Sequence, residues 1–475
     1  MTLASTSAAV IGNLVRDVAA ITPRALDGVL WTLTHLDDLS FALVRGAIAS
    51  ATHPERHVYP LLAELVAGRP VDVRVRTIDR GGRYVVVSDH HLLYASAPHD
   101  YFGGASRSLR TFRNERIYAA MIDRYAADGW TLVENGDVED LVVPEPAYDR
   151  LDCLAVGAVG RVVFRFDDTL RIVTRKRQLL RIVHTYAGYY QRLLAAFGPD
   201  RIVKLVGNHD AELLDPSFAE HVPLVTGGVP IHEFAVIPAG PDGPAIVICH
   251  GHQLDPWTCR ATARAIGESI TESFAWAGQG ADRIWDTTEW GPPLAAENAI
   301  VRAPTIGSWR GIVPKVRHMS ERYMARRLAR TFPGADRPWL VLGHTHEPRF
   351  RPAERYVNAA AAGRYQDLVW ACEIDRGAPK LVAYWCDEHD QLVRGELAPD
   401  GDRLTCPTRE VLGPLPALPY AGREPLDVID RRVDAVVPPP SWSMRWLAVR
   451  IAVHALFLAA AIGIPAWLVS LAIHH

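Results

Sequence analysis

The stretch Ile202-Val203-Lys204-Leu205-Val206-Gly207-Asn208-His209-Asp210 joins a largely apolar, β-branched run directly to a polar motif. Such a run is typical of a buried strand. The polar residues therefore follow the carboxyl end of a predicted strand, which is where open α/β sheets bind ligands. The stretch predicts an α/β fold with a functional site beyond the strand ends.

The same combination of apolar run and polar motif occurs four more times. The runs cover residues 84–87, 131–133, 245–248 and 339–342. The motifs are Asp89-His90-His91, Gly136-Asp137-Val138-Glu139-Asp140, His250-Gly251-His252 and Gly343-His344-Thr345-His346. Strand-like runs alternate with helical ones between them, which predicts the α/β class. We expect all five motifs to converge on one crevice.

These motifs contain the residue types that a pair of divalent metal ions requires. Neutral water attacks phosphate esters poorly, and two ions about 3.5–4 Å apart remedy this by binding a bridging hydroxide and the phosphoryl oxygens. Such a pair needs a bridging carboxylate, with imidazole, amide and carboxylate ligands on either side. Mn, Fe and Zn accept this mixed set, so the sequence predicts two divalent ions and leaves their identity open.

Each motif has an expected place in this site. One ion is assigned to Asp89, His91, Asp137 and His346, and the other to Asp137, Asn208, His250 and His344. Asp137 is the expected bridge, and Gly136 lets the backbone turn tightly before it. In the first motif either His90 or His91 is a candidate ligand.

A second set of residues is expected to support the reaction. His209 directly follows a ligand and cannot easily bind the same ion; protonated, it would stabilise the phosphoryl charge or protonate the leaving group. Asp210 is expected to orient His209 or to cap the following helix. Asp140 is expected to hydrogen-bond His209, and His252 to support the site or face the substrate.

The order of the motifs resembles the calcineurin-like metallophosphoesterase superfamily. The matching patterns are Asp-x-His, Gly-Asp-x-x-Asp, Gly-Asn-His-Asp, His-Gly-His and Gly-His-x-His, and the similarity extends to Tyr356-Val357-Asn358. The resemblance implies a four-layer α/β/β/α sandwich, a dinuclear metal centre and His209 as the catalytic histidine. The opening Ser88-Asp89-His90-His91-Leu92 is similar to the UDP-diacylglucosamine pyrophosphatase branch, which acts on a lipid-linked diphosphate. That branch usually has Arg at the position of His209.

Four regions are expected along the chain. Residues 1–75 form a helical N-terminal region, residues 76–397 the metallophosphoesterase domain, residues 398–445 a proline-rich linker, and residues 446–473 a transmembrane helix. Helical cap insertions are expected at about 141–200 and 255–335. Both contain basic stretches, which are either solvated helix faces or a cap that recruits an anionic substrate or lipid head groups.

The C-terminal segment is almost wholly apolar from residue 451 to 473, which matches the roughly 20 residues that cross a bilayer. Arg445 and Arg450 precede it and no Lys or Arg follows, so the positive-inside rule places the catalytic domain in the cytoplasm. The alternative is a buried helix docked on the domain or on a second subunit. The first residues show no basic stretch before an apolar core, so no secretory signal peptide is expected.

Composition narrows the function further. The formal net charge of -3 argues against a general nucleic-acid binder, and six scattered cysteines without a CxxC pair argue against a zinc-thiolate site or a disulfide framework. The prediction is a dinuclear metal-dependent phosphoesterase that hydrolyses a phosphodiester, phosphomonoester or diphosphate. The candidate substrates include membrane-associated and lipid-linked ones. The alternatives are a nuclease of the same superfamily and a non-catalytic, membrane-tethered metal-binding scaffold. The oligomeric state stays open.

Overall fold

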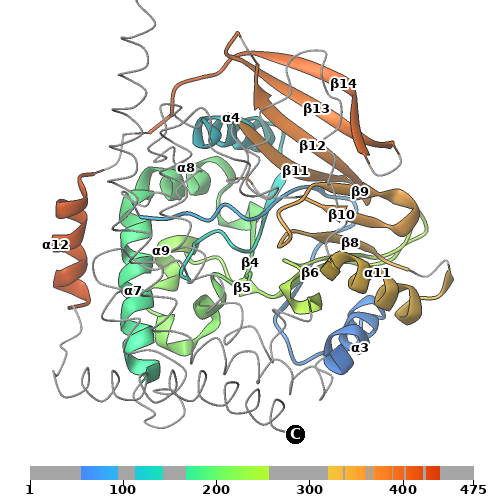
Figure 1. The fold of residues 1–475 in the computed structure, drawn as a ribbon, viewed down its shortest axis with the longest axis horizontal. Helices are drawn as coiled ribbons and strands as arrows, with labels where there is room; N and C mark the ends of the chain where they lie inside the picture. Colours follow the sequence, from blue (N-terminus) through green and yellow to red (C-terminus); the bar gives the residue numbers. More distant parts are fainter. Residues whose placement is uncertain are drawn as a thin grey trace, which may run out of the picture.

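Two β-sheets form the centre of the computed structural model (Figure 1). It describes residues 55–94, 113–142, 167–255, 319–334, 337–359, 362, 367–387, 389–400, 403–420 and 424–438. The six-stranded sheet has the order β1 (Val75–Thr77), β6 (Phe234–Ile237), β7 (Ile246–Ile248), β8 (Trp339–Leu342), β10 (Tyr356–Asn358) and β9 (Arg349–Arg351). The eight-stranded sheet has the order β14 (Arg403–Pro414), β13 (Gln391–Asp400), β12 (Ala378–Cys386), β11 (Leu368–Asp375), β2 (Arg83–Val87), β3 (Thr131–Asn135), β4 (Ile202–Leu205) and β5 (Ile231–His232).

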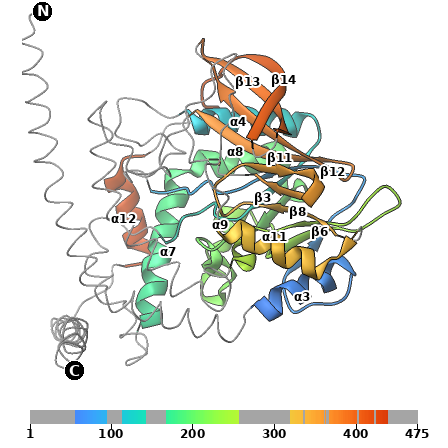
Figure 2. The ribbon, with the colours of Figure 1, turned by 45° about the vertical axis from the view of Figure 1, so that its right-hand side comes forward.

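Helices cover the outer face of each sheet, as Figures 1 and 2 show. The eight-stranded sheet packs against α4 (Asn114–Ala127), α7 (Asp167–Thr185), α8 (Ala187–Phe197) and α9 (Val222–Thr226). The six-stranded sheet packs against α3 (Glu55–Val66) and α11 (Met319–Thr331). Between the sheets lies a third apolar core, to which both contribute. This is the predicted α/β/β/α sandwich.

Strand β2 shows how the sequence produces these layers. Successive side chains of a strand point to opposite faces of the sheet. Val85 and Val87 accordingly pack against the helices, whereas Tyr84 and Val86 pack against the other sheet. Both faces of the strand carry apolar side chains, because helices cover one face and the other sheet covers the second.

The pairing of the strands brings the polar motifs together. Strands β2, β3 and β4 are parallel neighbours, and β7 and β8 are parallel neighbours in the other sheet. Each of these five strands is followed by one of the five motifs. The carboxyl ends of parallel strands meet at one edge of a sheet, so each sheet delivers its motifs to one edge, as predicted.

The predicted linker at residues 398–445 is wrong in part. Residues 403–414 form β14, the edge strand of the large sheet, and residues 426–436 form α12. The proline content suggested a linker, but an edge strand tolerates proline because one side of its backbone forms no ladder hydrogen bonds. Pro407 is one such residue, and it lies in β14 close to a shift in register with β13.

Helices are present in the described parts of the N-terminal region and of both insertions. Helix α3 packs on the six-stranded sheet, and residues 1–54 lie outside the described residues. In the first insertion, which was expected to be helical, the structure has α7 and α8, with Tyr186 between them. In the second insertion α11 is described, and residues 256–318 are outside the described part.

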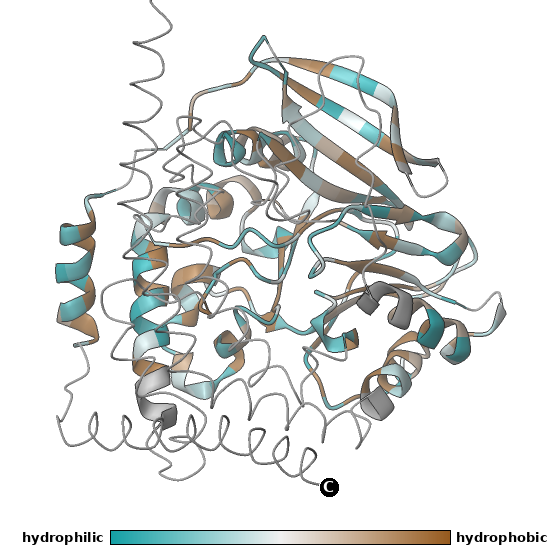
Figure 3. Cartoon of the chain, viewed as in Figure 1, coloured by the Kyte–Doolittle hydropathy of each residue, from teal (hydrophilic) through white to brown (hydrophobic). Residues whose placement is uncertain are grey.

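Helix α12 (Leu426–Val436) changes the interpretation of the first basic stretch. Hydrophilic and hydrophobic residues alternate around this helix (Figure 3), and Ile429 and Val433 pack with Leu180 of α7. Arg177 donates to Asp434 at 2.6 Å, and Arg181 donates to Asp430 at 2.7 Å. These two arginines are therefore buried ion-pair partners of α12. They belong neither to a solvated helix face nor to an open cap that binds anions.

Within the described ranges, no helix is long and apolar enough to cross a membrane. The segment 446–473 lies outside these ranges. The transmembrane helix and the cytoplasmic location therefore stay predictions.

Candidate metal centre

Five of the predicted ligands have an unusual backbone conformation. The angle φ is 56° at Asp89, 48° at His91, 52° at Asp137, 68° at His344 and 57° at His346. Left-handed backbone is uncommon for residues other than glycine, although Asp and His adopt it more readily than most. Residues held there cost of order 1–3 kcal/mol each and cluster at functional sites. The loops after β2, β3 and β8 are thus bent sharply at the residues with ligand chemistry.

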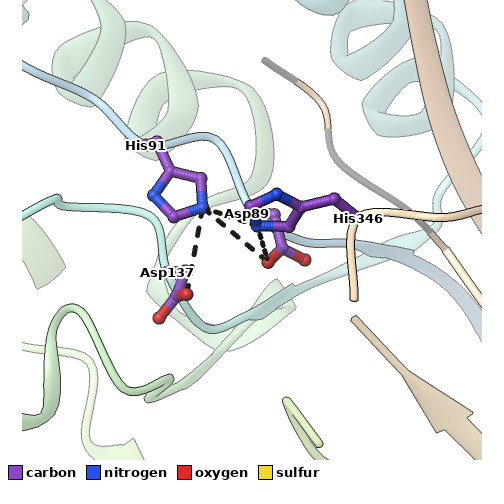
Figure 4. Close-up of side chains that lie close together, drawn as sticks. All are labelled: Asp89, His91, Asp137 and His346. Carbon is purple, nitrogen blue, oxygen red and sulfur yellow. Dashed lines mark hydrogen bonds and ion pairs between the residues drawn. The ribbon is translucent and has the colours of Figure 1, made fainter. Parts of the chain in front are cut away.

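Four of these side chains point toward one another (Figure 4). His346 Nε2 lies 3.1 Å from Asp89 Oδ1 and 3.0 Å from His91 Nε2. His91 Nε2 lies 3.9 Å from Asp89 Oδ1 and 3.9 Å from Asp137 Oδ2. One ligand atom from each residue lies within 4.8 Å of the others. They are the four residues predicted for the first metal ion.

This arrangement fits a cation. The ring nitrogen His91 Nδ1 is paired with Asp140 Oδ2 at 2.9 Å, which leaves Nε2 to present its lone pair to the cluster. The carboxylates of Asp89 and Asp137 are 0% and 1% exposed. Two imidazole nitrogens and two buried carboxylates thus face one small space, and a divalent ion there would satisfy all of them.

The carboxylates are kept in their ligand form by the neighbouring rings. Burial by itself raises the pKa of Asp89, but the attraction of His250 and His346 outweighs it and lowers this pKa to about 2. Burial likewise opposes the change at Asp137, but His250 and His209 hold the pKa of that carboxyl well below its ordinary value. Both groups are therefore ionised at neutral pH.

The residues predicted for the second ion lie next to the first cluster. Among the described residues, the buried Oδ1 atom of Asn208 has no hydrogen-bond partner. His250 Nδ1 lies 3.0 Å from the carbonyl oxygen of Asn135, which directs Nε2 toward Asp137 Oδ2 at 3.1 Å. An orphaned amide oxygen and an oriented imidazole beside the expected bridge are groups that fit a second ion.

His344 is placed differently from the prediction in one respect. Its ring lies 5.3 Å from that of His250, but its Nε2 atom is engaged by Asp255 Oδ2 at 3.1 Å. Within the described part of the chain, Asp137, His250 and His344 do not form a group of mutually close ligand atoms. The ring of His252 lies 5.5 Å from that of His250.

His209 and Asp140 form the pair that the sequence predicted. His209 Nδ1 lies 2.9 Å from Asp140 Oδ1, and the other oxygen of this carboxylate holds His91. Burial lowers the pKa of His209, but Asp140 and Asp137 outweigh it and raise this pKa to about 10. His91, Asp140 and His209 also have mutually close ligand atoms. Because both Nδ1 atoms already bond Asp140, we interpret this group as a hydrogen-bonded chain.

Asp210 has a role other than the predicted ones. Its Oδ1 accepts the backbone N–H of Gly207 at 2.6 Å, and its Oδ2 accepts that of Val138 at 3.0 Å. No side-chain cap of the following 3-10 helix is formed, and no described hydrogen bond joins Asp210 to the His209 ring. Both oxygens are used to tie the loop after β3 to the loop after β4. Burial and the nearby Asp137 and Glu139 raise the pKa of Asp210 to about 7.

The glycines of the motifs are required by crowding around the carboxylates. A Cβ atom on Gly207 would overlap Asp137 Oδ1, and one on Gly343 would overlap Asp89 Oδ2. Gly136 has a φ of 81°, the tight turn that the sequence predicted. Two strand-end loops thus approach the acidic ligands more closely than any side chain would allow.

The sequence offered either His90 or His91 as a ligand, and among the described residues it is His91 that joins the ligand cluster. His90 is buried edge-on against Tyr118, with ring centroids 4.8 Å apart, and burial lowers its pKa to about 4. Sequence analysis also missed Asp255 and Asn135 as partners of His344 and His250. The sequence gives a weak indication of both residues, because Asn135 directly precedes one motif and Asp255 closely follows another.

This chain has limited similarity to known proteins. No family model and no curated protein matches this chain. Among solved structures, the calcineurin-like phosphoesterase YfkN from Bacillus subtilis is 13% identical, with 78% of this chain and 98% of that chain covered at a TM-score of 0.27. A cold-active protein tyrosine phosphatase is also 13% identical, with 72% and 81% covered at a TM-score of 0.23. The resemblance to calcineurin-like phosphoesterases rests on the order of the motifs in the sequence.

Proposed function

We propose that this chain is a metal-dependent phosphoesterase, which hydrolyses a phosphoric ester or anhydride bond. One observation carries the proposal. Asp89, His91, Asp137 and His346 converge as a ligand cluster, and His209, held by Asp140, lies directly beside them. A group that binds metal is thus adjacent to a group that transfers a proton.

The proposed metal ligands are those argued from the sequence. Asp89, His91, Asp137 and His346 would hold one ion, and Asp137, Asn208, His250 and His344 would hold a second. Mn, Fe or Zn suits these nitrogen and oxygen ligands. Bound ions of this kind act as Lewis acids toward water and phosphoryl oxygens.

His209 supplies the acid chemistry. Its Nδ1 atom is engaged by Asp140, so the Nε2–H is the proton that faces away from this bond. An imidazolium with a raised pKa remains charged at neutral pH. It would stabilise the negative charge of the phosphoryl group and donate the Nε2 proton to the leaving oxygen. Asp140 keeps the ring charged and fixed in orientation.

The substrate class is proposed more broadly than the reaction. A phosphodiester, a phosphomonoester and a diphosphate all present the same phosphoryl chemistry to this site. The apolar segment at residues 446–473 supports a membrane-associated or lipid-linked substrate. Two of the basic residues that would have favoured an anionic cap are instead paired with α12, so this support rests on the C-terminal segment.

The test compares two chromogenic esters. Hydrolysis of bis-p-nitrophenyl phosphate and of p-nitrophenyl phosphate is measured with added Mn²⁺, Fe²⁺ or Zn²⁺, for the wild type, His209→Ala and the exposed-loop control His389→Ala. Activity that requires metal, persists in the control and is lost in His209→Ala supports the proposal. Bound metal without turnover of either ester, of a diphosphate or of a lipid-linked diphosphate would indicate a binding scaffold, and metal-dependent cleavage of DNA alone would indicate a nuclease.

A further inference from the structure

A fully buried lysine lies behind the metal centre, on the helix side of the large sheet. Lys204 of β4 is 1% exposed, and the two carboxylates around it, Glu134 of β3 and Glu139 of the following loop, are 2% and 0% exposed. Burying such charges is expensive, and apolar residues of similar volume are often equally stable in their place. Stability alone is therefore a weak reason for this group.

Helix α8 completes the group, which we call the Lys204 cluster (Glu134, Glu139, Tyr189, Tyr190 and Lys204). Lys204 Nζ donates to Glu139 Oε1 at 2.8 Å and to Glu134 Oε2 at 3.2 Å. Tyr190 donates its hydroxyl proton to Glu139 Oε1 at 2.9 Å, and Tyr189 donates to Glu134 Oε1 at 2.9 Å. The adjacent tyrosines of α8 thus hold different carboxylates.

The two carboxylates differ in their relation to the site. Glu134 lies within strand β3, whereas Glu139 lies in the loop between the ligand Asp137 and the His209 partner Asp140. The backbone of this loop is bonded to the loop after β2 and to His209: His91 N–H donates to Asp137 O at 3.0 Å, and Leu141 N–H donates to His209 O at 3.1 Å. Leu92 N–H donates to Val138 O at 2.8 Å, and Asp140 N–H donates to Leu92 O at 3.1 Å. Asp210 and Gln178 also bond the backbone of this loop, and Glu139 joins it to Lys204 of β4 and Tyr190 of α8.

We propose that Glu139 and Lys204 are positioning residues of the metal centre, and that Tyr190 couples helix α8 to it. Through the loop they set the places of Asp137 and Asp140, and with them the places of the metal and of His209. This inference rests on the proposed function, because it assigns the cluster a task only if the centre binds metal.

A second buried network of the same kind offers a control. Glu373 of β11 accepts bonds from Arg394 at 2.7 Å and from Tyr125, and it is also buried. It is paired with Val85 in the middle of β2, away from the strand's carboxyl end. A change at Glu373 removes a buried carboxylate without touching a ligand-bearing loop.

The test uses two matched pairs of variants. Tyr190→Phe and Tyr189→Phe each remove one hydroxyl that bonds a buried carboxylate, from neighbouring positions of one helix. Glu139→Leu and Glu373→Leu each replace a buried carboxylate by an apolar side chain. Mn²⁺ affinity is measured by titration calorimetry on the chelator-treated full chain, and thermal unfolding is followed without metal.

Removing groups that orient metal ligands typically weakens affinity by about 10- to 100-fold. We expect about a 10-fold loss of Mn²⁺ affinity for Glu139→Leu and a loss of about threefold for Tyr190→Phe, with Glu139→Gln close to wild type because Oε1 still accepts both bonds. Tyr189→Phe and Glu373→Leu should lower thermal stability and leave the affinity unchanged.

Each outcome decides one question. Equal affinities across both pairs, with equal losses of stability, would overturn the positioning role and leave the proposed function intact. A wild-type chain that binds none of Mn²⁺, Fe²⁺ and Zn²⁺ would overturn the proposed function itself. If Glu139→Leu does not fold, the tyrosine pair decides alone, since it leaves every charge in place.

Discussion

Replacing Asp140 by Asn tests the link between the metal cluster and His209. The carboxylate accepts from His209 Nδ1 with one oxygen and from His91 Nδ1 with the other, each at 2.9 Å. Asparagine has one acceptor oxygen, and its amide group donates. One histidine therefore loses its acceptor, and His209 loses the negative charge that stabilises its imidazolium.

The size of the change follows from the geometry. A carboxylate and an imidazolium whose charges lie about 4 Å apart attract by about 4 kcal/mol at an effective dielectric constant of 20. One pKa unit equals 1.36 kcal/mol, so the loss is about 3 units. The pKa of His209, about 10 in the native chain, should fall to about 7 in Asp140→Asn. At pH 8 only about a tenth of the rings would then carry the proton.

Two measurements check this prediction. NMR titration of ¹⁵N-labelled histidine in the chelator-treated protein follows the ring directly, with the His209 signals identified by their absence in His209→Ala. The kcat of Asp140→Asn, measured with metal, should fall about 10-fold more at pH 8 than at pH 6 when each value is divided by that of the wild type. A His209 pKa within half a unit of the wild-type value would refute the electrostatic argument, and parallel pH profiles would refute His209 as the acid.

Four further outcomes are expected. Asp137→Ala should lose metal and activity together, as measured by elemental analysis and ester hydrolysis; a fully active variant would remove the bridge assignment. Gly207→Ala should displace Asp137 and lower Mn²⁺ affinity by about 10-fold, since the new methyl group overlaps the carboxylate; unchanged calorimetric affinity would contradict the crowding argument. In the metal-free chain, the stabilisation from the raised pKa of His209 should be complete below about pH 6.5 and should disappear as the pH rises toward about 10; urea unfolding at pH 6, 8 and 10 should show this loss, and His209→Ala should not. Truncation after Pro440 should release the chain from membranes in a sedimentation assay; a truncated form that still sediments would show that residues 441–475 are not the sole anchor.

The strands and most site residues follow from the sequence for a local reason. A run such as Ile202–Leu205 is covered on both faces, so it is apolar almost throughout, and the polar residues that follow it belong to neither apolar core. This contrast between neighbouring residues is enough to locate the site from the order of residue types. His90 and His91 could not be distinguished in the sequence. Neighbouring residues at a strand end point in opposite directions, and the residue types do not show which of the two faces the site.

The features that sequence analysis missed depend on distant contacts. Asp210 is used by backbone N–H groups of two loops, and nothing in its own motif indicates them. The pairing of Arg181 with Asp430 joins residues 249 positions apart, which no periodicity records. The strand β14 was hidden by its prolines, because composition does not distinguish an edge strand from a linker.

Helix α12 has a practical consequence for any shortened form of this protein. A chain that ends before residue 426 would expose Leu180 to water beside Arg177 and Arg181, which would lose their ion pairs with Asp434 and Asp430. Such a mixed apolar and cationic patch adsorbs to anionic lipid vesicles and to polyanions without specificity. Vesicle binding by that form would report the surface created by the cut, whereas a form that ends after α12 would keep this surface covered.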